Sequence, residues 1–350
     1  MKKSDNIIEQ EKNTKIYYKG KLINYPFQTN IHELEKDEFI DCLYDLYYKN
    51  EKEEYDNFLD MLYGKFGKSI VEKFLKPYNE KLYACDLEKL DKDAMGRFFP
   101  YANFEDIINN MKKQQHSTYN DKFLYPKYGA QTFIDAIYNE LDKENVWLNT
   151  SINKIEEKDK YVITSSNQKI YFDYLINTIS LNNFLKLCSN DYYKRISNEL
   201  SYNQVLVFNL GFEKKSEFKE HWIYVPDKNI NFYRIGFYDN ILSNDKLSMY
   251  IEIGFSKDEK IDVSKQLNET LKNLEKMGII KDNKLKEYMY IIMNPAYVHI
   301  NNKDSNVVNE IFADLHNNNI YSIGRYGGWT YCSMEDCMIE AYRLAEELKK

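Results

Sequence analysis

The chain has 350 residues, of which 43% are hydrophobic and 29% charged, a balance typical of a globular protein and not of a disordered one. The formal net charge of −7 argues against a dedicated nucleic-acid binder, because phosphate contacts need clustered Lys and Arg. No apolar run approaches the roughly 18 residues of a membrane span. The first residues lack the apolar centre of a signal peptide, and the five cysteines form neither a disulfide framework nor a zinc motif. The sequence therefore predicts a reduced, cytoplasmic protein.

The first predicted elements are a short hairpin and a long helical region. Residues 15–23 form two apolar runs around a Lys19-Gly20 turn, and Pro26 ends the pairing because proline cannot donate to a strand ladder. From His32 to about Lys113, apolar residues recur at helical spacing. A strand at 123–125, a turn and a helix at 130–141 are expected next.

The second half of the sequence alternates strands with helices. Strands are predicted at 146–148, 152–156, 161–164, 169–172, 174–179, 204–210, 222–225, 232–237, 248–253, 288–293, 297–300 and 320–323. The nearly continuous apolar run at 174–179 predicts a buried strand. Helices are expected over 263–277 and from Ser305. This mixture predicts interleaved α+β lobes.

The C-terminal unit combines a strand, a glycine-rich turn and a capped helix. Three glycines lie within five residues from Gly324, which lets the backbone approach a ligand closely. Ser333 and Asp336 have capping-box spacing, and an apolar stripe follows them. Such a unit presents free N–H groups and a positive dipole end to a ligand, and Arg325 could bind a phosphate. An ordinary strand–turn–helix with Arg325 on the surface fits the same pattern.

Residues 323–327, with Trp329, Tyr331 and Met334, resemble the closing motif of FAD-dependent enzymes related to UDP-galactopyranose mutase and protoporphyrinogen oxidase. The resemblance implies that Arg325 lies along the FAD pyrophosphate. It also implies that the N–H groups of Met334 and Glu335 face the flavin. The full set of cofactor-binding residues expected from it is Gly324, Arg325, Gly327, Trp329, Tyr331, Met334 and Glu335.

Further segments resemble the same group in the same order, from about Tyr17 to Leu348. They are Tyr-Pro-Phe-Gln at 25–28, a "PYNEKLW"-like stretch at 77–83, a "GRFVP"-like stretch at 96–100, a "YPKGG"-like stretch at 125–129 in which Tyr128 replaces a glycine, and segments at 221–224 and 232–234 that resemble "HWIYFP" and "FYR".

The fold class implied is α+β, of the α/β FAD/NAD(P)-binding-like kind. A truncated FAD-binding lobe is interleaved with a mixed-sheet substrate lobe and a helical insertion. We expect an N-terminal tail and hairpin at 1–30, a mainly helical substrate-side region at 31–120 and part of the FAD-binding lobe at 121–180. The mixed-sheet substrate lobe follows at 181–300, and the FAD-contacting strand–turn–helix at 301–350.

One expected motif is missing from this sequence. The family opens with a strand–turn–helix of the G-x-G-x-x-G type, which holds the ADP half of FAD, and none of the 12 glycines makes that pattern. The chain is then the downstream product of a split gene, the partner of a separately encoded dinucleotide-binding chain, or a degenerate homologue. FAD binding by the chain alone is correspondingly doubtful. A sheet without its central strands exposes apolar edges, and the strand at 174–179 is expected to be the most exposed.

Two arginines and two histidines are candidates for substrate chemistry. Arg97 and Arg234 suit a substrate phosphate because a guanidinium binds that anion bidentately, although lone arginines often form structural ion pairs. His221 and His32 have the chemistry of general acids or bases, but a hydrogen-bonded, partly buried histidine is the alternative.

An aromatic wall for a uridine or sugar ring is predicted from Trp222, Tyr224, Phe232 and Tyr233. Alternation across a sheet assigns two of these four to the core. Cys332 and Cys337 are interpreted as packing residues, because no base lies at recognisable spacing.

Three functions remain open. The first is a flavin-dependent enzyme resembling UDP-galactopyranose mutase, acting on a nucleotide-sugar in surface-glycan biosynthesis without net redox change. The second is a flavin amine or porphyrinogen-type oxidase, and the third is a non-catalytic remnant or subunit unable to hold FAD alone. A polar, arginine-bearing pocket favours the first function, and an apolar aromatic slot favours the second.

Overall fold

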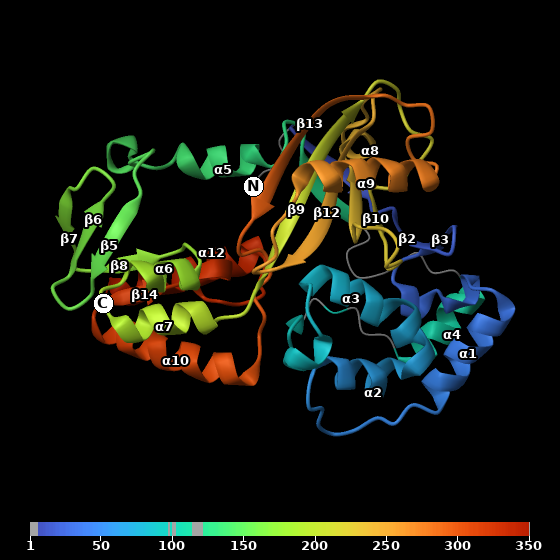
Figure 1. The fold of residues 1–350 in the computed structure, drawn as a ribbon, viewed down its shortest axis with the longest axis horizontal. Coiled ribbons are helices and arrows are strands. Elements are labelled where there is room, and N and C mark those ends of the chain that lie inside the picture. The colour runs from blue at the N-terminus through green and yellow to red at the C-terminus, as the bar shows by residue number, and fades with distance from the viewer. Residues whose placement is uncertain (1–5, 97–98, 100–102, 114–121, 350) are drawn as a thin grey trace. The chain divides into compact units, whose positions relative to one another are not determined.

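The computed structural model describes residues 6–96, 99, 103–113 and 122–349 (Figure 1). The chain divides into two compact units. Unit 1 comprises Met1–Lys92, Arg97–Glu140 and Asn203–Ala296, and unit 2 comprises Asp93–Gly96, Leu141–Tyr202 and Tyr297–Lys350. Neither unit is one continuous stretch, which confirms the interleaved α+β organisation expected from the sequence.

Unit 1 contains, among the described residues, a seven-stranded sheet in the order β13-β9-β12-β11-β10-β2-β3. Its strands are β2 (Thr14–Tyr18), β3 (Lys21–Asn24), β9 (Asn203–Phe212), β10 (Trp222–Tyr224), β11 (Arg234–Phe237), β12 (Ser248–Ser256) and β13 (Leu285–Met293). Among the described strands of this sheet, β10 and β2 are the one pair that is parallel. Alternating residues of the central strands form an apolar core with α9 (Val263–Lys276), which contributes Leu267 and Leu274 (Figure 1).

The predicted hairpin is confirmed as the antiparallel pair of β2 and β3. Lys19 and Gly20 form its turn with positive φ angles of 48° and 81°. Glycine suits this conformation because it has no Cβ to clash with the carbonyl.

The helical region of unit 1 is also confirmed. It comprises α1 (Lys36–Tyr47), α2 (Phe58–Ile70), the π-turn η3 (Val71–Leu75), α3 (Lys76–Tyr83) and α4 (Phe104–Lys113). The remaining elements of unit 1 are β1 (Ile7–Glu11), β4 (Lys122–Pro126), α5 (Gln131–Tyr138), α8 (Tyr238–Leu242) and the 3-10 turns at Phe27–Thr29, Ile31–Glu33 and Leu87–Lys89. β1 pairs with β4 in a separate antiparallel ladder.

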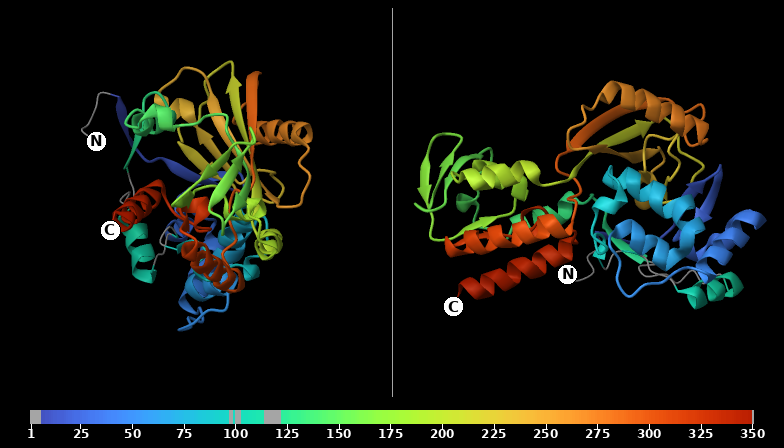
Figure 2. Two further views of the ribbon diagram at one scale, coloured as in Figure 1. Left: turned by 90° about the vertical axis from the view of Figure 1, so that its left-hand side faces the viewer. Right: turned by 60° about the horizontal axis from the view of Figure 1, so that its bottom comes forward.

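Unit 2 contains two small sheets. β5 (Ile152–Glu156), β6 (Tyr161–Thr164) and β7 (Lys169–Tyr171) are antiparallel, whereas β8 (Leu175–Asn177) and β14 (Ile320–Ser322) are parallel (Figure 2). Its helices are α6 (Leu181–Leu187), α7 (Asp191–Glu199), α10 (Asn302–Asn317), α11 (Gly324–Gly327) and α12 (Met334–Leu348), with a 3-10 turn at Lys143–Asn145. Residues of β5, β6, β14, α6, α7 and α10 share one apolar core.

Two strand predictions in unit 2 are wrong, and a third strand forms but is less buried than predicted. Residues 146–148 form no strand, because Asn149 adopts a left-handed φ of 55° and turns the chain directly after a 3-10 turn. Residues 297–300 contribute only an isolated bridge between Val298 and Tyr202. The run at 174–179 forms the short strand β8, but Ile176 is 48% exposed and not buried. β8 is exposed as expected, yet it is not the most exposed strand, because Met289 of β13 is 56% exposed.

Candidate cofactor and substrate sites

The C-terminal strand–turn–helix forms as the sequence predicts. β14 ends at Ser322, the chain turns at Gly324 with a φ of 78°, and the single-turn helix α11 leads to α12. The N–H group of Gly324 donates to the Glu340 carboxylate at 2.7 Å, which fixes α11 against α12. The turn and the helix therefore form one connected piece of structure at the carboxyl end of β14.

At two glycines of this turn, main-chain atoms of this chain lie where a side chain would begin. A Cβ atom on Gly327 would lie 2.7 Å from the main-chain oxygen of Asn177, and one on Gly328 would lie 2.8 Å from that of Gly324. The space that the sequence assigned to a ligand is thus filled by β8 and by the turn itself. The role of Gly324 and Gly327 towards a cofactor stays a prediction.

Arg325 lies against two tyrosine rings. Its guanidinium carbon is 4.5 Å from the ring centre of Tyr331 and 5.4 Å from that of Tyr297, and its Nη1 donates to the Cys332 carbonyl at 3.0 Å. Within the described residues no carboxylate forms an ion pair with it. A guanidinium held on an aromatic face with an unmatched charge suits a phosphate.

The start of α12 carries the predicted capping box. Ser333 Oγ accepts from the Asp336 N–H at 3.2 Å, and the Asp336 carboxylate accepts from the Ser333 N–H at 2.8 Å. In the described part of the chain, the N–H groups of Met334 and Glu335 meet no acceptor, as expected at the first turn of a helix. The carboxylates of Glu335 and Asp336 weaken the positive dipole end, so the two N–H groups provide hydrogen bonds more than charge.

Trp329 is part of the core of unit 2. Its side chain is 6% exposed and its ring packs edge-on against Tyr202 at 6.0 Å. Its Nε1 is buried without a hydrogen-bond partner among the described residues. An unmet donor costs about 1–3 kcal/mol, so this turn is suited to a polar ligand atom. The unpaired Arg325, the two helix N–H groups and this donor together fit a flavin dinucleotide.

The substrate candidates of unit 1 have partners within the protein. His221 is 6% exposed, and its Nδ1 accepts from the Asn13 N–H at 3.1 Å. Burial lowers the pKa of His221, which keeps the ring neutral and able to accept. Arg234 forms an ion pair of 2.6 Å with Glu252, its cross-strand neighbour on β12. Arg97 lies outside the described residues, and His32 is partly buried.

The four aromatic candidates divide between a surface and the core. Trp222 and Tyr224 share one face of β10, and Trp222 Nε1 donates to the Tyr224 hydroxyl at 3.2 Å. Tyr224 also contacts Tyr25, with ring centres 4.9 Å apart. Phe232 and Tyr233 are at most 1% exposed. Two of the four are therefore core residues, but alternation along a strand is not the reason, because Phe232 and Tyr233 are adjacent and both precede β11.

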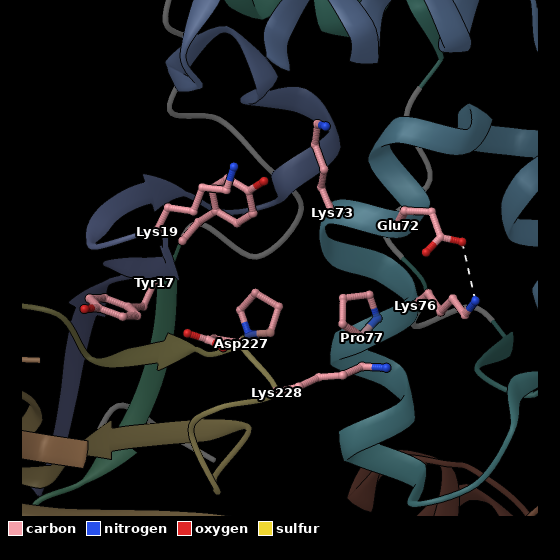
Figure 3. Close-up of a pocket in the computed structure, with 10 residues that line it drawn as sticks. Tyr17, Lys19, Glu72, Lys73, Lys76, Pro77, Asp227 and Lys228 are labelled. Carbon is pink, nitrogen blue, oxygen red and sulfur yellow. Dashed lines mark hydrogen bonds and ion pairs between the residues drawn. The ribbon is translucent and has the colours of Figure 1, made fainter. Parts of the chain in front are cut away.

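A pocket of about 400 Å³ in unit 1 is lined by none of the residues selected from the sequence (Figure 3). It lies between the β2–β3 hairpin, the start of α3 and the chain after β10. Lys76 pairs with Glu72 at 3.4 Å, and Lys228 reaches the pocket from the opposite side (Figure 3). The sequence signal was the lysine-rich stretch around Pro77, but only the fold shows which distant residues face it.

Lys81 is a second group that sequence reasoning missed. Its ammonium donates to the main-chain oxygens of Val225 at 2.8 Å and Asp227 at 2.9 Å, and also to that of Phe232. Burial lowers its pKa to about 7, while Asp227 raises it. Lys81 therefore fastens α3 to the connection between β10 and β11, which forms one wall of the pocket.

The described residues contain no group of three or more His, Cys, Asp or Glu side chains arranged to hold a metal ion. No helix among them is long and apolar enough to cross a membrane.

The mixed sheets, the parallel pair and the terminal strand–turn–helix form a mixed α+β fold that several solved structures share. Among solved structures, reduced UDP-galactopyranose mutase matches with a TM-score of 0.87 and 22% identity, over 94% of this chain and 74% of that one. A putative protoporphyrinogen oxidase from Exiguobacterium sp. 255-15 matches with a TM-score of 0.70 and 15% identity, over 97% and 82%. A fatty acid isomerase from P. acnes, described as CLA-producing, matches with a TM-score of 0.62 and 11% identity, over 97% and 80%. No family model matches the chain. These identities establish the fold alone, and they confirm the predicted resemblance at that level.

Proposed function

We propose that the chain is the substrate-side and C-terminal part of a FAD-dependent enzyme that, like UDP-galactopyranose mutase, acts on a nucleotide-sugar in surface-glycan biosynthesis. The observation that carries this proposal is the TM-score of 0.87 over 94% of the chain. The TM-score falls to 0.70 for the oxidase, although a larger share of this chain is covered. The arrangement of the elements therefore favours the mutase.

The residues of the C-terminal unit have defined tasks in this proposal. Arg325 binds the pyrophosphate of FAD, since its charge has no carboxylate partner in the described chain. Met334 and Glu335 donate their N–H groups to the flavin ring, and Tyr331 holds Arg325 in place. FAD, when bound, supplies the redox-active ring that the reaction needs.

The substrate surface of the proposal lies on β10 and β11. Trp222 and Tyr224 present adjoining aromatic side chains on one face, which suits stacking with a uridine ring. Arg234 is 26% exposed while Glu252 is 11% exposed, so the guanidinium can share its charge with an anion. The five free cysteines fit a reducing, cytoplasmic location.

An oxidase of the amine or porphyrinogen type is the second candidate. The ion pair with Glu252 already matches the charge of Arg234, and the side chains that contact the Tyr224 ring include the aromatic rings of Tyr25 and Tyr78. A site of this character suits a neutral aromatic substrate better than a diphosphate. The third candidate, a remnant or subunit that does not hold FAD alone, is favoured by the exposed apolar residues of β8 and α12.

A flavin titration tests the cofactor assignment. We expect FAD fluorescence to be quenched on binding, and Arg325→Met to weaken binding at least tenfold, about 1.4 kcal/mol. Arg343→Met is the matched control, because Arg343 lies exposed on α12, and it should leave the affinity unchanged. Absence of binding at saturating FAD would exclude a self-sufficient flavoenzyme.

The substrate class is tested separately. Loaded with FAD and reduced, the protein should interconvert the pyranose and furanose forms of UDP-galactose, followed by chromatography. Oxygen consumption with an amine or a porphyrinogen, and no isomer formed, would favour the oxidase.

A further inference from the structure

Two thiols are in contact at the start of α12. The sulfur atoms of Cys332 and Cys337 lie 3.6 Å apart, which is a contact between two thiols and not a bond. Both side chains are partly exposed, whereas Cys42 and Cys188 are buried. The pair therefore combines two properties that thiol oxidation needs, a partner within reach and access from solvent.

The local structure of the helix start explains why these two residues meet. Ser333 is the N-cap of α12, so Cys332 precedes the cap and Cys337 is the fourth residue of the helix. Side chains at these two positions commonly pack against each other across the helix start. The capping box of Ser333 and Asp336 fixes this turn, and the Cys337 N–H donates to the Ser333 oxygen at 3.2 Å. The thiols thus remain in contact while the first turn of α12 is formed.

A short movement would join the two sulfur atoms. They lie 3.6 Å apart, and a disulfide bond is about 2.05 Å long, so they must approach each other by about 1.5 Å. The main chain of Cys337 is held inside the helix by its bond to Ser333. Cys332 lies before the helix, so we expect Cys332 to make most of this movement.

The same turn holds Arg325. Nη1 of Arg325 donates to the main-chain oxygen of Cys332 at 3.0 Å. A Cβ on Gly324 would lie 3.9 Å from the Cys337 sulfur, so this thiol lies beside the start of α11. A movement of Cys332 towards Cys337 therefore draws the acceptor oxygen away from the guanidinium of Arg325.

We propose that Cys332 and Cys337 form a reversible disulfide by exchange with a low-molecular-weight disulfide, and that this bond weakens FAD binding by moving the Cys332 carbonyl away from Arg325. The effect on FAD rests on the proposed function, whereas the disulfide itself does not. Disulfides of reducing compartments are usually transient and serve catalysis or redox sensing. A regulatory bond at the cofactor site belongs to that kind.

The exchange has two steps. The Cys337 thiolate attacks one sulfur of the oxidant, whose S–S bond breaks and releases one thiolate. The Cys332 thiolate then attacks the Cys337 sulfur of this mixed disulfide and releases the second thiolate. The two protons of the cysteines pass to the two released thiolates, so the protein loses two electrons and the oxidant gains two.

The second step sets the pH dependence of the reaction. Burial, together with the contact to Cys337, raises the pKa of Cys332 to about 12. The thiolate is the reactive form, and its fraction at Cys332 increases as the pH rises towards this value. We therefore expect the disulfide to form slowly near pH 7 and faster at pH 9.

Thiol counting tests the disulfide without reference to the cofactor. The folded full chain is incubated with oxidised glutathione, and its free thiols are then counted in denaturant. We expect two fewer than the five free thiols of the reduced chain. A protease that cleaves after glutamate separates the two cysteines at Glu335, so their fragments should stay joined until a reductant is added.

Single serine variants identify the two partners. Cys332→Ser and Cys337→Ser should each abolish the joined fragments. Cys85→Ser is the matched control, because Cys85 is also partly exposed but lies in unit 1, and it should still lose two thiols to the joined fragments.

Flavin titration and amide hydrogen exchange test the consequence for Arg325. We expect the oxidised chain to bind FAD about fivefold more weakly, because Arg325 keeps its charge but loses a hydrogen bond that positions it. Cys337→Ser treated with the same oxidant should bind FAD as the reduced wild type does. In the chain without FAD, oxidation should speed amide exchange in α11, because the bond that ties Arg325 to Cys332 is lost.

The outcomes separate the two proposals. A folded chain that keeps all five thiols at pH 9 in excess oxidised glutathione would overturn the disulfide and leave the proposed function standing. Joined fragments with unchanged exchange in α11 and unchanged FAD affinity would overturn the effect on Arg325. A disulfide that speeds exchange in α11 of a chain that binds no FAD in either form would contradict the proposed function and support the thiol pair.

Discussion

The ammonium group of Lys81 donates a hydrogen bond of 2.8 Å to the main-chain oxygen of Val225, directly after β10. The same group also bonds to the oxygens of Asp227 and Phe232, so a single side chain satisfies three carbonyls of one connection. Such bonds offset part of the cost of burying an ammonium, and the pKa of about 7 reflects the part that remains. The position of the chain between β10 and β11 therefore depends on a residue of α3.

Replacing Lys81 by methionine tests this dependence. Three carbonyls lose their donor, and we expect the free energy of unfolding to fall by about 2 kcal/mol at neutral pH. The pKa of Lys81 is about 7 in the folded protein and 10.5 in its ordinary state. Between these values the unfolded chain binds more protons, so wild-type stability rises with pH by up to about 1.4 kcal/mol per unit. The gap between wild type and variant should widen from pH 7 to pH 10 in denaturant titrations.

Lys89→Met is the control for this experiment. Lys89 is 72% exposed in its ion pair with Asp86, and such pairs contribute little. We expect its effect to stay within about 0.5 kcal/mol at every pH. A Lys81→Met variant as stable as this control would contradict the role assigned to Lys81.

Most of the correct predictions rest on patterns of residues that are close together in the sequence. The Lys19-Gly20 turn and the Ser333 capping box involve residues at most three apart, and both formed as expected. The bonds of Lys81 connect residues 144 or more apart, and no local pattern identifies them. The glycine at 327 indicated a close approach, but only the fold shows that Asn177 is what approaches.

Burial was the property that sequence patterns predicted least well. An apolar run such as 174–179 predicts a buried strand because most parallel strands have neighbours on both sides. Whether Ile176 is buried depends on strands that other segments supply, so exposure cannot follow from the run itself. For the same reason the apolar stripe of α12 does not by itself determine burial: Leu344 is buried, whereas Met338 is 46% exposed.

The ion pair between Arg234 and Glu252 yields a second prediction. Arg234→Met leaves the carboxylate, 11% exposed, without its partner, and should lower the free energy of unfolding by about 2–3 kcal/mol. Glu252→Gln should cost less, because the guanidinium is 26% exposed and reaches water.

The two variants also separate a structural role of Arg234 from a role in substrate binding. UDP should bind more tightly to Glu252→Gln, whose guanidinium is released, and more weakly to Arg234→Met, as measured by calorimetry. Equal UDP affinity in all three proteins would exclude Arg234 from the substrate site.

Gly327 yields a third prediction. A Cβ there would lie 2.7 Å from the Asn177 oxygen, so Gly327→Ala must push α11 away from β8. We expect a loss of about 2–3 kcal/mol and faster amide hydrogen exchange in β8 and β14. Gly20→Ala is the control, because a Cβ on Gly20 would have no atom within 4 Å and only the positive φ of 81° opposes the substitution. It should cost about 1 kcal/mol and leave exchange in unit 2 unchanged. Equal effects of both variants on β8 would contradict the assigned contact.

The capping box of α12 yields a fourth prediction, in which stability and cofactor affinity change in opposite directions. Asp336→Asn weakens the bond to the Ser333 N–H and should lower the free energy of unfolding by about 0.5–1 kcal/mol. It also removes a negative charge from the first turn, beside the N–H groups of Met334 and Glu335. FAD should therefore bind about two- to fivefold more tightly at low salt. This gain in affinity should fade as ionic strength rises, because screening weakens the helix-end interaction.

Ser333→Ala is the control. It destabilises α12 by about 1 kcal/mol and retains the carboxylate, so it should give no gain in FAD affinity. Flavin fluorescence titrations at two salt concentrations distinguish the variants. An unchanged affinity for Asp336→Asn would show that the flavin does not face the start of α12.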